Sequence, residues 1–287
     1  MKIIECPRDA MQGLTEFVPT SLKARYINQL LKVGFDTIDF GSFVSPKAIP
    51  QMRDTADVLA QLDLSQSDTK LLAIIANQRG AQIACDFEEI NQLGYPLSLS
   101  ETFQLRNTNR TIDVALDDLA EIQELCESED KQLVVYLSMS FGNPYGDPYE
   151  TAYVEEFVNR LDQLEVGVIS LSDTVGVSHP DIINDLFETL IPKFPHIEFG
   201  AHLHSTPDTR NEKLLAAYES GCRRIDGAIM GFGGCPMAKD ELVGNMATEN
   251  IVQLLDKMEQ KHGLDLTAFG KAKSIANEIF TNLSRQA

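Results

Sequence analysis

Short runs of β-branched and apolar residues alternate with amphipathic segments along the chain, and this alternation constrains the fold more than any other feature. Eight such runs predict strands, at residues 2–5, 37–40, 70–75, 96–99, 133–139, 168–171, 197–203 and 224–229. Helical patterns lie between them, for example at residues 22–33, 117–129, 153–164, 181–190 and 209–220. Eight strands that alternate with helices over about 250 residues are typical of an α/β fold of the (β/α)8 TIM-barrel type.

The 287 residues are predicted to form one domain, because no low-complexity stretch and no Pro/Gly/Ser-rich linker divides them. Residues 249–261 and 267–283 predict a last barrel helix and one more, so residues 264–287 are expected to be a helical extension of domain 1–287. Helices are expected to end at Gly34, Gly94, Gly167 and Gly221. The alternative is an open doubly wound sheet, which usually has a glycine-rich phosphate loop where this chain has CPRDAMQG.

Charge indicates which partners are disfavoured, and cysteine usage indicates the cellular compartment. The chain has 43 acidic and 24 basic residues, a formal charge of −19 at pH 7, which argues against nucleic acid or an anionic membrane as partner. No apolar run predicts a signal peptide or a membrane span. The five cysteines are odd in number and lack C-x-x-C spacing, which favours a reducing compartment. We therefore expect a cytoplasmic protein.

The sharpest local signal is the pair His202 and His204 in the segment EFGAHLH. The period of two in a strand puts both imidazoles and Gly200 on one face, and the apolar residues between them on the other. Function in a TIM barrel lies at the carboxyl ends of the strands, so both imidazoles are expected at the barrel mouth. Two histidines at this spacing form a common half-site for a divalent metal, and the alternative is a pair of hydrogen-bonded polar core residues.

Barrel closure extends this half-site. The last barrel strand pairs with the first, so Asp9 is expected beside His202 and His204, with Asn245 from the loop that follows the last strand. A mixed set of nitrogen and oxygen ligands suits octahedral Mg²⁺ or Mn²⁺ better than zinc. Taken alone, Asn245 fits a turn residue as well.

Other strand-end residues are candidates for substrate binding and catalysis. Residues 231–236, GFGGCP, form a glycine-rich stretch in which Cys235 is either a general acid or base on a mobile loop or a small buried residue. Asp39 and Asp173 are either functional carboxylates or structural acids, Asp39 paired with a cation such as Arg8. The residues expected to bind substrate are Arg8, Gln12, Ser138 and Lys47.

Five segments together resemble one enzyme family. PRDAMQ, SFVSPKAIPQM, ISLSDTVGV, AHLH and GFGGCPMA occur in the order and spacing of 3-hydroxy-3-methylglutaryl-CoA (HMG-CoA) lyases, over about residues 2–255. The resemblance implies retro-aldol cleavage of an acyl-CoA to acetyl-CoA and acetoacetate, with a divalent ion chelated by the hydroxyl and carbonyl of the substrate. It implies that Asp9, His202, His204 and Asn245 bind the metal, that Arg8 stabilises the enolate and that Cys235 is the catalytic thiol. It also suggests a homodimer.

The chain departs from the family pattern near the site. Asp39 stands where the family usually has Glu, Ala10 replaces the glycine of RDG, and Thr15 and Ser205 replace a lysine and an acid. The loop from Cys235 to Asn245 is one residue longer. These departures leave the acyl group of the substrate open. Two other functions also stay open, a Claisen-type synthase that condenses acetyl-CoA with a 2-oxo acid and a non-catalytic metal-binding barrel.

Overall fold

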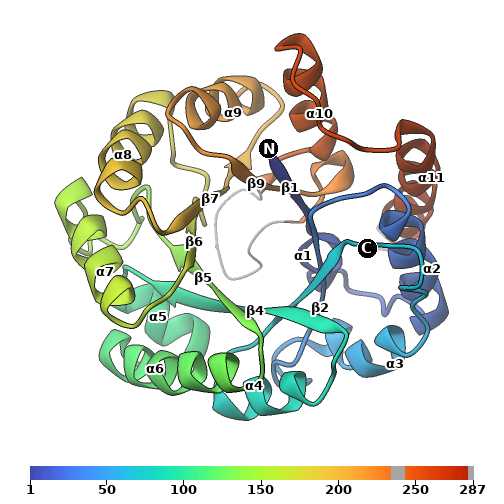
Figure 1. Ribbon diagram of the computed structural model, residues 1–287, viewed down its shortest axis with the longest axis horizontal. Helices are drawn as coiled ribbons and strands as arrows, with labels where there is room; N and C mark the ends of the chain where they lie inside the picture. The colour runs from blue at the N-terminus through green and yellow to red at the C-terminus, as the bar shows by residue number, and fades with distance from the viewer. Residues whose placement is uncertain (234–242, 284–287) are drawn as a thin grey trace.

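Eight parallel strands close into a barrel in the order β1-β2-β3-β4-β5-β6-β7-β9 (Figure 1), which confirms the predicted TIM barrel. The computed structural model describes residues 1–233 and 243–283. The barrel strands are β1 (Lys2–Glu5), β2 (Thr37–Ser42), β3 (Lys70–Ile74), β4 (Ile90–Ser98), β5 (Gln132–Ser138), β6 (Val168–Ser172), β7 (Glu198–His202) and β9 (Arg224–Gly227). A separate antiparallel pair joins β8 (His204–Ser205) to β10 (Gly244–Asn245).

Helices connect the strands, and most of them surround the barrel in a ring (Figure 1). They are α1 (Pro7–Gln12), α2 (Thr20–Leu31), α3 (Thr55–Leu59), α4 (Gln78–Cys85), α5 (Glu101–Thr108), α6 (Ile112–Ser128), α7 (Thr151–Gln163), α8 (Pro180–Lys193), α9 (Arg210–Glu219), α10 (Thr248–Lys257) and α11 (Leu266–Leu283), with short 3-10 turns η1 (Pro50–Met52) and η2 (Ile229–Gly231). Asn77, Ser100 and Thr111 begin α4, α5 and α6, each accepting a hydrogen bond from the backbone N–H three residues later. Local capping chemistry therefore sets where these helices start.

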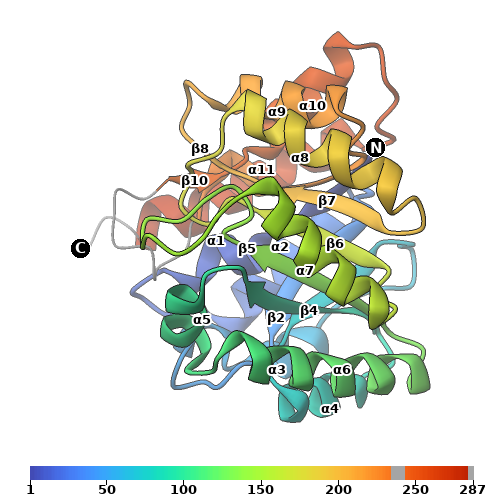
Figure 2. The same ribbon diagram turned by 90° about the vertical axis from the view of Figure 1, so that its left-hand side faces the viewer.

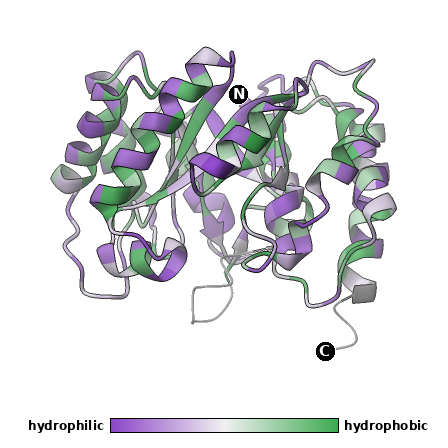
Figure 3. Cartoon of the chain, turned by 90° about the horizontal axis from the view of Figure 1, so that it is seen from below, coloured by the Kyte–Doolittle hydropathy of each residue, from purple (hydrophilic) through white to green (hydrophobic). Residues whose placement is uncertain are grey.

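The helices are amphipathic, as their sequences predict, and Figure 3 shows hydrophilic and hydrophobic residues alternating along them. The main core lies between helices and strands. A smaller apolar cluster fills one side of the barrel interior and consists of Leu72, Ile74, Val134, Tyr136 and Val168. On the other side of the interior, β6, β7 and β9 carry polar side chains, namely Ser170, Ser172, His202, Arg224 and Asp226. The candidate site lies at the carboxyl end of this polar side.

The last helix, α11, lies beside α2 on the outside of the barrel (Figure 1). Phe35 and Phe269 meet edge to face with ring centroids 6.3 Å apart, and Arg25 forms an ion pair with Glu278. No helix within the described residues is both long and apolar enough to cross a membrane.

Two of the four expected helix-ending glycines are confirmed. Gly34 and Gly221 have φ angles of +86° and +96°, the left-handed conformation that ends many helices. Gly94 was wrongly expected there, because β4 starts at Ile90 and contains Gly94. A Cβ atom on Gly94 would lie 2.5 Å from Ile74 Cδ1, so the glycine is needed for packing inside the barrel.

The expectation that a helix ends at Gly167 is also wrong. Gly167 lies just before β6, and the left-handed residue in that turn is Glu165, with φ of +59°. The turn that ends α7 therefore comes two residues earlier than the glycine suggests.

Candidate metal and catalytic site

Asp9, His202 and His204 come together at the carboxyl end of the barrel. Each offers one ligand atom, and these three atoms lie within 4.8 Å of one another. Asp9 comes from α1, which starts with Pro7 at its first position directly after β1. His202 is the last residue of β7 and His204 begins β8, which Figure 2 shows with β10 at one end of the barrel. Sequence-distant residues thus meet because β9 pairs with β1 and closes the barrel.

Hydrogen bonds orient both imidazoles toward the same point. His204 Nδ1 lies 3.0 Å from the backbone carbonyl of Thr174, which can only accept, so Nδ1 carries the proton. His204 Nε2 is buried and has no hydrogen-bond partner in the described part of the chain. His202 Nδ1 lies 3.0 Å from Asp226 Oδ2. In both rings Nε2 is therefore left free, which is the arrangement of metal-binding histidines.

The charges of the group suit a cation. Burial lowers the pKa of His202, but the hydrogen bond and charge of Asp226 outweigh it and raise the pKa above its ordinary value. Burial and the neighbouring His202 lower the pKa of His204. Burial works against ionisation of Asp9, but Arg8 and the two histidines hold its pKa below the usual range. An ionised carboxylate beside two imidazoles fits a divalent ion with mixed nitrogen and oxygen ligands.

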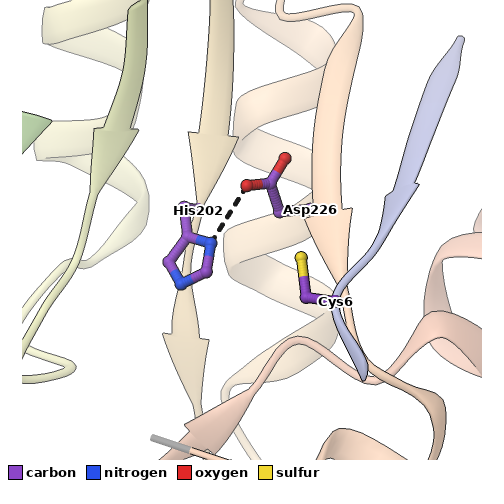
Figure 4. Close-up of side chains that lie close together, drawn as sticks. All are labelled: Cys6, His202 and Asp226. Carbon is purple, nitrogen blue, oxygen red and sulfur yellow. Dashed lines mark hydrogen bonds and ion pairs between the residues drawn. The ribbon is translucent and has the colours of Figure 1, made fainter. Parts of the chain in front are cut away.

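A second group of side chains, Cys6, His202 and Asp226, also lies close together (Figure 4). Burial and the nearby carboxylates raise the pKa of the Cys6 thiol well above its ordinary value, so Cys6 is a neutral thiol and not a thiolate ligand. Figure 4 shows that Asp226 already occupies Nδ1 of His202. This group therefore supports His202 and does not fit a metal centre of its own.

Asn245 lies in β10 opposite His204. Its amide nitrogen donates to Asp9 Oδ2 at 2.6 Å and to the carbonyl of Phe232 at 2.9 Å. In this arrangement Asn245 holds the Asp9 carboxylate in place, and its role as a direct metal ligand stays a prediction.

Arg8 is buried and lies between two carboxylates. Its Nε donates to both oxygens of Asp39 at 3.0–3.1 Å, and Nη2 donates to Asp39 Oδ2 at 2.5 Å. Its Nη1 donates to Asp9 Oδ1 at 3.1 Å and to Gln12 Oε1 at 2.9 Å. A guanidinium has five N–H groups, so one N–H on Nη2 remains without a partner in the described residues. Burial raises the pKa of Asp39 to about 6 although Arg8 opposes this shift.

A cavity of about 480 Å³ opens above these residues. Its polar wall includes Arg8, Asp9, Gln12, Ser138, Ser172, Thr174, His202 and His204, and its apolar wall includes Val44, Ile49, Ile74, Pro96 and Phe103. Arg106 of α5 lies at the same cavity, 4.7 Å from the ring centre of Tyr145. Lys47 is exposed on the loop after β2 and does not line the cavity, whereas its neighbour Ala48 does. The cavity therefore has one charged and polar wall and one apolar wall.

Comparison with known families agrees with this geometry. The HMGL-like family model matches residues 2–275. The chain belongs to the HMGL-like family. Hydroxymethylglutaryl-CoA lyase YngG of Bacillus subtilis is 33% identical over 260 residues, which cover 91% of this chain and 86% of that protein. The cytoplasmic 3-hydroxy-3-methylglutaryl-CoA lyase of Rattus norvegicus is 32% identical over 269 residues, 93% of this chain and 77% of that protein.

Solved structures of HMG-CoA lyases have the same fold as this HMGL-like protein. The enzyme of Acinetobacter baumannii, in complex with coenzyme A and 3-methylmalate, superposes with a TM-score of 0.89 at 31% identity, covering 97% of this chain and 90% of that one. The B. subtilis HMG-CoA lyase gives a TM-score of 0.89 at 31% identity, covering 96% and 92%. The resemblance inferred from the sequence motifs is thereby confirmed.

Asp173 is not among the residues that line the cavity of this HMGL-like protein. Its carboxylate accepts hydrogen bonds from the backbone and hydroxyl of Ser178 and from Lys213 Nζ at 3.0 Å. Lys213 is itself buried and also donates to the carbonyl of His204 at 2.9 Å. Ser170 and Ser172 face the barrel interior, so the strand alternation turns Asp173 outward. Lys213 thus links Asp173 to the backbone of His204, and the catalytic role expected for Asp173 stays a prediction.

Cys235 lies outside the described residues. The chain approaches it through Gly233, whose φ is +98° and where a Cβ atom would lie 2.5 Å from Asn245 Nδ2 and 3.0 Å from the carbonyl oxygen of Asp9. Only glycine allows the backbone to pass this closely over the proposed ligands.

Sequence motifs do not indicate Asp226, which contacts His202, or Lys213, which donates to the backbone of His204. Asp226 had a usable signal, since it is an acid inside the last strand pattern and two residues from Arg224 on the same face. Lys213 had a weaker signal, a lysine on a helix face that is otherwise apolar.

Proposed function

We propose that the protein is a divalent-metal-dependent lyase that cleaves HMG-CoA, or a close 3-hydroxyacyl-CoA, to acetyl-CoA and a 3-oxo acid, which is acetoacetate for HMG-CoA. Membership of the HMGL-like family and about 30% identity to named HMG-CoA lyases over most of the chain support this activity. The observation that carries it is the cluster of Asp9, His202 and His204 with free Nε2 atoms beside the buried Arg8.

The three-residue cluster would hold Mg²⁺ or Mn²⁺, with Asn245 as a further ligand or as the partner that fixes Asp9. When bound, the ion makes the tertiary hydroxyl of the substrate easier to deprotonate. Loss of that proton lets the adjacent C–C bond break, which releases the 3-oxo acid and leaves the enolate of acetyl-CoA.

Arg8 is the residue placed to stabilise this enolate. Its charge is permanent, its remaining Nη2 N–H is free to donate, and Asp39 keeps the guanidinium from rotating. Because the ion pair exists before substrate arrives, little reorganisation is needed as negative charge grows. Cys235 on the glycine-rich segment is the proposed proton donor to the enolate carbon, since a thiol is a competent general acid near neutral pH.

The cavity walls support an acyl-CoA substrate. Gln12 and Ser138 are proposed to contact the polar part of the acyl group, and Lys47 to contact the CoA portion outside the cavity. Arg106 lies in none of the ion pairs within the described residues, and its charge supports binding of an anionic group such as the second carboxylate of HMG-CoA.

We also propose a cellular location and an oligomeric state. The four described cysteines are all free, which supports a location in the cytoplasm. A homodimer is proposed from the family alone, and light scattering of the purified protein tests it.

The test of the proposed function is a cleavage assay after metal has been removed with a chelator. Acetyl-CoA release from HMG-CoA is expected to return when Mg²⁺ or Mn²⁺ is added, and Asp9→Ala is expected to stay inactive at the same metal concentration. A panel of 3-hydroxyacyl-CoAs tests the acyl specificity, and acetyl-CoA with 2-oxo acids tests the synthase alternative. No cleavage of any 3-hydroxyacyl-CoA with either ion would contradict the proposal.

A further inference from the structure

Five buried polar atoms inside the barrel have no hydrogen-bond partner among the described residues. They are Nε and Nη2 of Arg224, the hydroxyl oxygens of Tyr136 and Ser170, and Oδ1 of Asp226. Buried polar groups are almost always hydrogen-bonded, because leaving one unpaired costs about 1–3 kcal/mol and more for a charged group. Five such atoms in one region indicate that something outside the protein chain bonds to them.

Strand register places four of these atoms, those of Tyr136, Ser170 and Arg224, in one layer. Tyr136 pairs with Ser170 across β5 and β6, Ser170 pairs with Gly200, and Gly200 pairs with Arg224 of β9. His202 is two residues beyond Gly200 on the same face of β7, and Asp226 is two residues beyond Arg224 on β9. The unpartnered layer therefore lies directly below the pair of His202 and Asp226.

Gly200 makes room for the arginine in this layer. A Cβ atom there would lie 3.0 Å from Arg224 Cδ and 3.2 Å from Ser170 Oγ, so the arginine side chain crosses the barrel over the glycine. Arg224 is 1% exposed, and its one ionic contact within the described residues joins Nη1 to Glu198 at 3.5 Å. Its charge also attracts the carboxylate of Asp226, although no direct hydrogen bond joins them.

We propose that enclosed water molecules fill this layer and connect Arg224 to the free oxygen of Asp226, which makes Arg224 a positioning residue for the metal ligand His202. Three N–H groups on two arginine nitrogens and two hydroxyls supply donors, and Asp226 Oδ1 supplies an acceptor, which gives a water the two to four partners that it needs. With Oδ1 held by this network, Oδ2 stays on Nδ1 of His202 and keeps Nε2 directed at the proposed metal. The inference rests on the proposed metal site.

The test measures metal binding by the full-length apoprotein, without substrate. Replacing a group that supports a metal ligand typically weakens metal affinity 10–100-fold, so Arg224→Met is expected to weaken Mn²⁺ binding, measured by calorimetry, by about that factor. Arg223→Met is the matched control, because Arg223 is the adjacent residue but is exposed and stacks on Tyr218. The control is expected to bind Mn²⁺ as the wild type does.

A second variant covers the case in which Arg224→Met does not fold. Arg224→Lys keeps the charge but loses the planar set of donors, and it is expected to bind Mn²⁺ several-fold more weakly than the wild type with unchanged thermal stability. A crystal structure is expected to show waters between Arg224 and Asp226. Unchanged Mn²⁺ affinity in the folded variants, or a layer without such waters, would overturn this inference alone. Absence of metal binding by the wild type would instead overturn the proposed function.

Discussion

Arg8 and Asp39 form a buried pair in which Nε and Nη2 of the guanidinium both donate to one carboxylate. The pair fixes the plane of the guanidinium at the edge of the cavity, next to Asp9. Asp39 thus orients the residue that is proposed to stabilise the enolate, and it does so without lining the cavity itself.

Asp39→Asn is expected to lower kcat by about two orders of magnitude, because an electrostatic donor that is no longer held in position loses most of its effect. Mn²⁺ affinity is expected to change little, since Asp9, His202 and His204 are untouched. Steady-state kinetics and calorimetry measure the two effects separately. Asp39→Glu, which restores the acid usual in the family, is expected to keep most of the activity. A kcat for Asp39→Asn within threefold of wild type would remove Asp39 from this role.

Substitutions of a proposed metal ligand and of the proposed catalytic thiol are expected to differ in their effect on metal binding. His204→Ala is expected to lose metal binding and turnover together, because Nε2 of His204 has no other use in the described structure. Cys235→Ala is expected to lower kcat by about 10²–10⁴ and to leave Mn²⁺ affinity unchanged. A fully active Cys235→Ala would show that another group protonates the enolate.

Arg106→Gln tests substrate recognition. The variant is expected to raise KM for HMG-CoA several-fold and to leave kcat nearly unchanged, because uniform binding is lost and the chemical step is not. The matching substrate is 3-hydroxy-3-methylbutyryl-CoA, which lacks the second carboxylate. If the KM values for both thioesters rise equally, Arg106 contacts the CoA phosphates and not the acyl carboxylate.

Lys213 and Asp173 form a buried ion pair, so removing one partner is expected to destabilise the protein more than removing both. Lys213→Met leaves a buried carboxylate without its cation and is expected to lower the free energy of unfolding by about 3–5 kcal/mol. The exposed Lys193→Met, which removes the ion pair with Glu155, is expected to cost less than about 1 kcal/mol. Urea unfolding measures both. Adding Asp173→Asn to Lys213→Met should recover part of the loss, and no recovery would argue against an uncompensated charge as the cause.

Glu5 predicts a pH dependence of stability. Burial raises its pKa from 4.5 to about 8, while Ile229 N–H and the Thr248 hydroxyl contact its carboxyl group. A raised folded-state pKa means that the contribution to stability is complete below pH 4.5 and is lost as the pH rises to about 8. Glu5→Gln does not ionise; its amide oxygen can still accept from Ile229 N–H, and its NH2 group can donate to the Thr248 hydroxyl oxygen.

The free energy of unfolding of Glu5→Gln, relative to wild type, is therefore expected to rise by up to about 1.4 kcal/mol per pH unit between pH 5 and 8 and to level off above that. Urea unfolding at a series of pH values measures this difference. A difference that does not change with pH would mean that Glu5 ionises with an ordinary pKa.

The sequence was sufficient for the barrel and for the histidine pair, because both depend on periodicity and on the ends of strands. Asp9 could be placed beside His202 from barrel closure alone. The contact of Asp173 with Lys213 becomes predictable only when the alternation of Ser170 and Ser172 is followed one residue further, to the outward face of the strand. The layer around Arg224 could not be predicted, because it depends on which side chains cross the barrel interior over Gly200.

The most direct measurement of the central claim is the product balance from HMG-CoA. The account predicts that the metal-loaded protein forms acetyl-CoA and acetoacetate in equal amounts, and that a chelator stops both. Free CoA with intact 3-hydroxy-3-methylglutarate would contradict it, because that result is thioester hydrolysis and not cleavage of a C–C bond.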